Sequence, residues 1–85
     1  MYYVYVLVSE VDGQFYTGAT GDLKKRVKEH NEGKVTSTEK RGPLHLVYYE
    51  ACLDKRDAFR REKYLKTGMG KRYLRNRLRD TLEKL

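Results

Sequence analysis

The spacing of apolar and polar residues divides the chain into strand-like and helix-like segments. Tyr2–Val8 is a run of β-branched and aromatic residues, which is typical of a strand. The Asp12-Gly13 pair that follows is a strong hairpin signal, so Gln14–Thr17 is predicted to return antiparallel to the first strand. A third β-prone run, Pro43–Cys52, predicts a third strand.

Three helices are expected from capping residues and from the spacing of apolar side chains. Their predicted ranges are Leu23–Asn31, Asp54–Thr67 and Lys71–Leu85. A turn over Gly18–Asp22 precedes the first helix, and the glycine-rich segment Gly68–Gly70 is expected to separate the second helix from the third. The apolar stripes of the last two helices are expected to be Ala58, Phe59 and Leu65, and then Leu74, Leu78, Leu82 and Leu85.

In chain order these segments form a ββαβαα arrangement, which predicts an α+β fold with a three-stranded antiparallel sheet flanked by helices. The 85 residues correspond to one small domain, residues 1–85. A folded chain of this length has a radius of gyration of roughly 12 Å. It has no room for a deep cavity between lobes, so any chemistry is expected on an open face or in a shallow groove.

The composition excludes several classes of protein. The only cysteine, Cys52, excludes an internal disulfide framework and a multi-cysteine zinc site. The longest apolar run, Tyr2–Val8, is shorter than the ~20 residues of a membrane-spanning helix and lacks the features of a signal peptide. We therefore expect a cytoplasmic protein that has no membrane partner.

The positive charge is concentrated in the second half of the chain. Residues 1–36 contain five basic and five acidic residues, whereas residues 37–85 contain fourteen and seven and so carry the entire net charge of +7. An excess of basic residues can simply form a solvated helix face that keeps a small protein soluble. Here the excess is of one sign, rich in arginine and interleaved with Tyr64 and Tyr73, which favours a polyanionic partner such as nucleic acid.

Polar residues on faces that should be apolar identify candidate functional side chains. Arg26 and His30 share a predicted helix face with the apolar Leu23 and Val27. Glu62 falls within the apolar stripe of the second predicted helix, so its carboxylate is expected to point partly inward. Burying a carboxylate costs several kcal/mol unless a cation, a metal ion or hydrogen bonds compensate.

Each candidate also has a purely structural interpretation. Glu62 can pair with Arg26 in an ion pair that only supports the fold. His30 can cap a helix or fill a half-buried position, and tyrosines such as Tyr5 and Tyr16 are common fillers of strands. The joint placement of the five residues favours a functional interpretation, because the predicted hairpin and two helices could bring all of them together.

These residues resemble the motif of the GIY-YIG endonuclease family. Tyr3-Val4-Tyr5 stands where the first triplet of that motif would be, and Tyr16-Thr17-Gly18 matches the second triplet. Tyr16 follows Tyr5 by eleven residues, which is the spacing of the family. Arg26 and His30 follow at the spacing of the family, ten and fourteen residues after the second triplet begins. Glu62, which is followed by a lysine and a tyrosine, resembles the metal-binding glutamate of the family.

The resemblance extends from Tyr2 to about Leu78 and is greatest to small bacterial members that consist of this domain alone. It implies a metal-dependent endonuclease that hydrolyses phosphodiester bonds in DNA. So small a domain has little surface for reading a base sequence, so substrate structure or a partner protein is expected to direct the cleavage.

The resemblance also implies a role for each candidate. Glu62 would bind one divalent ion, Mg²⁺ or Mn²⁺. Arg26 would neutralise the phosphoryl oxygens in the transition state. A tyrosine would be the general base, with Tyr16 favoured over Tyr5, and nearby cations would lower its pKa from an ordinary value of about 10. His30 would orient this tyrosine or share its proton.

The basic segment is expected to contact the phosphate backbone. The candidate residues for nucleic-acid binding are Lys63, Lys66, Lys71, Arg72, Arg75 and Asn76, of which the asparagine matches the family by position only. Two other functions fit the same pattern. One is a non-catalytic nucleic-acid-binding module with the same fold, and the other is a protein-interaction domain whose cationic helices bind an acidic partner.

Overall fold

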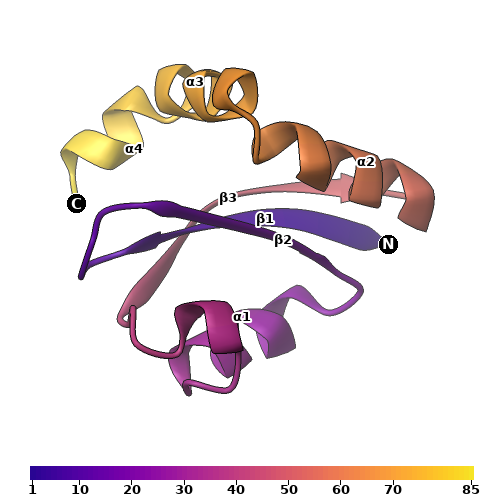
Figure 1. The fold of residues 1–85 in the computed structure, drawn as a ribbon. Coiled ribbons are helices and arrows are strands. Elements are labelled where there is room, and N and C mark those ends of the chain that lie inside the picture. The colour runs from indigo at the N-terminus through magenta and orange to yellow at the C-terminus, as the bar shows by residue number, and fades with distance from the viewer.

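A three-stranded antiparallel sheet forms the centre of the molecule. The computed structural model describes residues 1–85, and its strands are β1 (Tyr2–Ser9), β2 (Phe15–Thr20) and β3 (Leu44–Cys52). The strand order is β2-β1-β3, so β1 is the central strand and β2 and β3 are the two edges (Figure 1). The β1–β2 hairpin and the third strand are those predicted from the sequence.

Helices cover both faces of the sheet. They are α1 (Leu23–Asn31), the short 3-10 helix η1 (Thr36–Thr38), α2 (Lys55–Leu65), α3 (Gly68–Arg77) and α4 (Arg79–Glu83). Figure 1 shows α1 on one face and α2, α3 and α4 on the opposite face. None of these helices has the length and apolar character that a membrane crossing requires. The predicted α+β fold is confirmed, with the last predicted helix divided at Leu78 into α3 and α4.

The alternation of side chains along β1 supplies a separate core on each face. Val4 and Val6 point toward α2 and α3, where they pack with buried residues of those helices. Their buried partners are Ala58, Leu65, Leu74 and Leu78. Tyr5 and Leu7 point to the α1 face and pack near Leu44. The second core is smaller and contains a phenol, which places polar chemistry on the α1 face.

Strand β2 is longer than the sequence predicts. A turn was expected from Gly18, but Gly18 pairs with Tyr5 and Thr20 pairs with Tyr3 in the β1–β2 ladder. The strand therefore continues to Thr20, and the connection to α1 is only Gly21 and Asp22. The pairing with β1 outweighs the turn preference of glycine.

The glycine segment between the last two predicted helices is also different from its prediction. Gly68 and Gly70 lie in the first turn of α3, because the Thr67 side chain caps this helix by accepting a hydrogen bond from the Gly70 N–H at 3.1 Å. A Cβ atom on Gly70 would lie 2.5 Å from the Cα of Leu65. The glycine thus allows α3 to begin directly against the end of α2.

Two residues of the predicted apolar stripes are exposed. Phe59 is 46% exposed, and its ring lies beneath the Lys55 ammonium group at 5.4 Å. Leu85 is 60% exposed beyond the end of α4. The expectation that these two side chains are buried was wrong, because the sheet does not extend far enough to cover them.

Candidate active site

The ring of Tyr5 lies across a glycine on the neighbouring strand. Gly18 of β2 is directly opposite Tyr5 of β1, and a Cβ atom at Gly18 would lie 2.6 Å from the Tyr5 Cζ atom. Such a contact is far shorter than van der Waals separation allows, so the absence of a side chain at position 18 makes room for the phenol. The Tyr5 hydroxyl consequently lies over β2, the edge strand of the sheet.

Three polar side chains join the Tyr5 hydroxyl in one hydrogen-bond network. The hydroxyl oxygen is 2.8 Å from His30 Nε2 and accepts a hydrogen bond of 3.4 Å from Arg26 Nε. His30 Nδ1 is in turn 2.7 Å from the hydroxyl of Thr38 in η1. His30 and Thr38 are both buried, at 5% and 1% exposure, so this network is largely shielded from solvent.

His30 is held in its neutral form. Burial, followed by the charge of Arg26, lowers the pKa of His30 from its ordinary value of 6.5. A neutral imidazole has one nitrogen that donates and one that accepts. Both nitrogens of His30 face hydroxyl groups, which can do either, so the Tyr5–His30–Thr38 chain can carry a proton along its length.

The pKa of Tyr5 is raised, whereas the sequence analysis expected nearby cations to lower it. Burial is the largest cause, and it outweighs the opposing hydrogen bond and charge of Arg26. Tyr5 is therefore a neutral phenol near pH 7, and it needs a proton acceptor before it can act as a base. The adjoining neutral His30 is such an acceptor.

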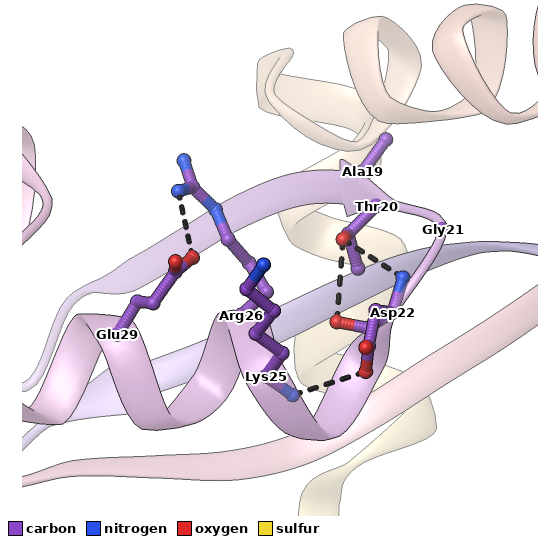
Figure 2. Close-up of a pocket in the computed structure, with 7 residues that line it drawn as sticks. All are labelled: Ala19, Thr20, Gly21, Asp22, Lys25, Arg26 and Glu29. Carbon is purple, nitrogen blue, oxygen red and sulfur yellow. Dashed lines mark hydrogen bonds and ion pairs between the residues drawn. The ribbon is translucent and has the colours of Figure 1, made fainter.

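Arg26 connects this network to an open pocket at the start of α1. Figure 2 shows its guanidinium group paired with Glu29, one turn further along the helix, at 3.4 Å. The pocket has a volume of about 450 Å³, and Asp22, whose side chain caps α1, also lines it. The Arg26 side chain is 40% exposed, so its guanidinium group can reach a bound anion.

Glu62 of α2 points partly inward, as its spacing predicts. Its side chain is 21% exposed and forms an ion pair of 2.8 Å with Lys66, one turn later in α2. The ion pair with Arg26 that the structural interpretation required is not present, because Arg26 pairs with Glu29. The charges of Glu62 and Lys66 nevertheless act on the pKa of Tyr5 in opposite directions, and Lys66 lines the pocket that contains His30.

The donor set at Glu62 fits a hydrated magnesium ion. No group of three or more His, Cys, Asp or Glu side chains gathers in the structure, so Glu62 would be a single carboxylate ligand. Mg²⁺ commonly binds proteins through one or two carboxylates while keeping several waters and taking substrate phosphate oxygens. Lys66 contacts Oε2 of Glu62, which leaves Oε1 for an ion.

Tyr16 has different partners from those expected. Its hydroxyl donates to Asp12 at 2.7 Å and accepts from Arg41 Nε at 3.2 Å. The hydrogen bond to Asp12 is the largest cause of a raised pKa for Tyr16. Tyr16 shares a pocket wall with His30 and Lys66, but it forms no hydrogen bond with the residues around Tyr5.

The chain is similar to known proteins over most of its length. A family model described as the GIY-YIG catalytic domain matches residues 1–79. The chain belongs to the GIY-YIG family. Membership places it among nuclease domains, which bind nucleic acid and generally use a divalent metal ion.

Individual relatives are small proteins of similar length. A UPF0213 protein of Clostridium perfringens is 48% identical over 67 residues, which are 78% of this chain and 71% of the relative. A UPF0213 protein of Staphylococcus aureus is 39% identical over 75 residues, 87% of this chain and 90% of the relative. The solution NMR structure of a UPF0213 protein from Bacillus halodurans superposes with a TM-score of 0.55 at 40% identity, covering 87% of this chain and 82% of that one.

The candidate residues for nucleic-acid binding in this GIY-YIG domain fall into two groups. Lys66 and Lys71 line the pocket that also contains His30, and Arg75 lines the adjoining one. The other three are exposed on the outer sides of the last two long helices: Lys63, Arg72 and Asn76. Only the first group therefore adjoins the Tyr5 network.

Sequence reasoning missed two residues of the site. Gly18 is part of the second motif triplet, so its place in the motif was visible but its contact with Tyr5 was not. Thr38 lies between the first predicted helix and the third predicted strand, and no spacing rule connects it to His30. A buried threonine beside a buried histidine becomes apparent only from the folded chain.

Proposed function

We propose that this protein is a metal-dependent endonuclease that hydrolyses phosphodiester bonds in DNA. It selects its DNA substrates by their structure. The observation that carries this proposal is the Tyr5 hydroxyl, which contacts both Arg26 and His30. A phenol with a proton acceptor on one side and a guanidinium on the other suits the activation of water next to a phosphate.

Tyr5 is the proposed general base, in place of Tyr16, which the resemblance favoured. As Tyr5 takes a proton from the attacking water, its own proton passes to His30 Nε2 across the 2.8 Å contact. His30 is available to receive it because its lowered pKa leaves the imidazole neutral. Thr38 then accepts a hydrogen bond from Nδ1, which fixes the orientation of the ring.

Arg26 is the proposed stabiliser of the transition state. Its Nε atom is directed to Tyr5, and its terminal nitrogens are available to the phosphoryl oxygens once the long contact with Glu29 gives way. A guanidinium group suits this role because it is always charged and can donate two parallel hydrogen bonds to a phosphate.

Glu62 is the proposed ligand of one Mg²⁺ or Mn²⁺ ion. When bound, the ion supplies a Lewis acid that stabilises the leaving oxygen. Lys66 restrains the carboxylate through its 2.8 Å ion pair. The surface of this small domain offers little for sequence readout, so a partner protein that targets the enzyme is part of the proposal.

Cleavage of labelled DNA tests the proposal. Duplex, flap, gapped and branched substrates are incubated with Mg²⁺ or Mn²⁺ and with wild type, Glu62→Gln or Arg26→Ala. We expect metal-dependent cleavage by wild type and a loss of about 100-fold to 1000-fold in each variant, typical of removing a group that stabilises the transition state. Chelation should abolish cleavage.

Matched controls are available on the same chain. Glu83→Gln removes an exposed carboxylate of α4, and Arg56→Ala removes an arginine whose side chain is 86% exposed. Both should cleave within about threefold of wild type. If wild type binds these DNA substrates tightly but cleaves none of them, the protein is a non-catalytic nucleic-acid-binding module.

A further inference from the structure

Two adjoining pockets lie along the free edge of β2. They have volumes of about 350 Å³ and 430 Å³ and share Phe15 and Lys71 in their walls. The first contains His30 from the α1 layer and Lys66 from the α2 layer. Because residues from both layers meet there, the groove formed by the two pockets, called here the β2-edge groove, wraps around the outer edge of the sheet.

The wall of the β2-edge groove carries cations and no carboxylate. Its charged side chains are Lys66, Lys71 and Arg75. Lys71 and Arg75 are one helical turn apart on α3, and neither takes part in any ion pair of the structure. No acidic residue occurs in α3, so nothing on this helix neutralises them.

The other end of β2 is electrically different. The pocket shown in Figure 2 contains Lys25 and Arg26, but it also contains the carboxylates of Asp22 and Glu29. Its lining therefore has no net charge. The Tyr5 hydroxyl over Gly18 lies between this balanced pocket and the cationic groove. Attraction for phosphate extends from the network in one direction along β2 and not in the other.

We propose that the β2-edge groove holds the phosphate backbone of one DNA strand, on one side only of the bond that is cut. Along the hairpin the groove is lined from Thr17 to Gly13, five residues that span about 17 Å at roughly 3.3 Å each. About five nucleotides of a DNA strand cover that length at 3.4 Å each. Lys66, Lys71 and Arg75 are the contacts, and the strand beyond Arg26 is held weakly.

Binding in chelator tests this surface independently of any cleavage. A fluorescent single-stranded or duplex DNA of 20 nucleotides is titrated with wild type, with Lys71→Glu/Arg75→Glu, and with Arg77→Glu/Arg79→Glu as a control of equal charge change at exposed positions outside both pockets. We expect the first pair to weaken binding about tenfold or more and to lower the salt slope by about 2, since each lost phosphate contact lowers it by about 1. The control pair should weaken binding less than threefold. Equal weakening by both pairs would overturn the proposal.

The length of the substrate supplies a second test, which rests on the proposed function. Oligonucleotides are shortened from either side of the cleaved bond in two series. The series shortened on the side that the β2-edge groove holds should lose cleavage once fewer than about five nucleotides remain on that side. The other series should still be cleaved with only one or two nucleotides left on its shortened side. Equal length dependence on both sides would contradict a one-sided groove. If nothing is cleaved, the binding comparison still decides whether the groove exists, so failure of the nuclease proposal is distinguishable.

Discussion

Two tyrosines of one hairpin show how similar positions acquire different chemistry. Tyr5 and Tyr16 lie on neighbouring strands, on the sheet face covered by α1. Tyr5 is 2% exposed, and its hydroxyl contacts a guanidinium and a neutral imidazole. Tyr16 is partly exposed, and its hydroxyl donates a short hydrogen bond to Asp12.

The difference shows that the partner of a phenol decides its role. The Asp12 carboxylate accepts a hydrogen bond from Tyr16 and so favours the neutral phenol. Tyr5 instead contacts the neutral His30, which Thr38 contacts on its other side and which can take up a proton. Motif spacing identifies both tyrosines, but the surrounding turn and loops distinguish them.

Substitution of Gly18, which contacts Tyr5, should have the largest effect on the environment that distinguishes Tyr5 from Tyr16. In Gly18→Ala the new methyl group would lie 2.6 Å from the Tyr5 Cζ atom, so the buried phenol must move. We expect cleavage to fall about 100-fold or more, because a displacement near 1 Å can cost that much, together with a loss of about 1–3 kcal/mol in the free energy of unfolding. Cleavage rates and denaturant unfolding measure both.

Gly21→Ala is the matched control, because a Cβ atom there meets only an ordinary contact of 3.8 Å with the ring of Tyr2. It should leave cleavage within about threefold of wild type. If Gly18→Ala cleaves as well as Gly21→Ala, the position of the Tyr5 hydroxyl does not matter for the reaction.

The protonation of His30 gives a smaller effect, visible in stability. Its pKa is lowered in the folded chain, whereas the unfolded chain takes up a proton near 6.5. The unfolded state therefore binds more protons just below pH 6.5, and the free energy of unfolding should fall as the pH decreases from there toward the folded pKa, by at most about 1.4 kcal/mol per pH unit. Above pH 6.5 this contribution is fully present.

Denaturant unfolding between pH 4.5 and 8 measures this dependence. His30→Gln should have a flatter profile than wild type below pH 6.5. Parallel profiles for wild type and His30→Gln would show that His30 is not held neutral in the folded chain.

Local patterns predicted much of the fold and part of the site. The β-prone runs and the hairpin signal identified the sheet, and the limits of α1 were predicted as they occur. The inward direction of Glu62 followed from its place between Ala58 and Leu65 on one helix face. These features depend on neighbours within a few residues, which a sequence displays directly.

Features that depend on distant segments were not predictable. Arg41, from the loop before β3, binds Tyr16 across 25 positions of the chain, and Thr38 approaches His30 only because η1 folds back on α1. Neither contact leaves a periodic pattern. The spacing of the motif treats Tyr5 and Tyr16 alike, so it does not show which hydroxyl has which long-range partners.

The basic segment shows that the sequence also does not reveal which charged residues are paired. Arg56, Arg60 and Arg61 of α2 are each paired with a nearby carboxylate, whereas the basic residues of α3 have no acidic partner. A count of basic residues treats the two helices as equivalent. All four basic residues of α3 are free of ion pairs, and two of them, Lys71 and Arg75, line the β2-edge groove.

The most direct measurement is the single-turnover rate of DNA cleavage by Tyr5→Phe and by Tyr16→Phe, with saturating protein and Mg²⁺. Removing the Tyr5 hydroxyl should slow cleavage by about 100-fold to 10,000-fold, the usual contribution of a general base, without weakening DNA binding. Removing the Tyr16 hydroxyl should slow it less than tenfold. A Tyr5→Phe variant that cleaves at the wild-type rate, or a Tyr16→Phe variant that alone loses activity, would contradict the assignment of the base to Tyr5.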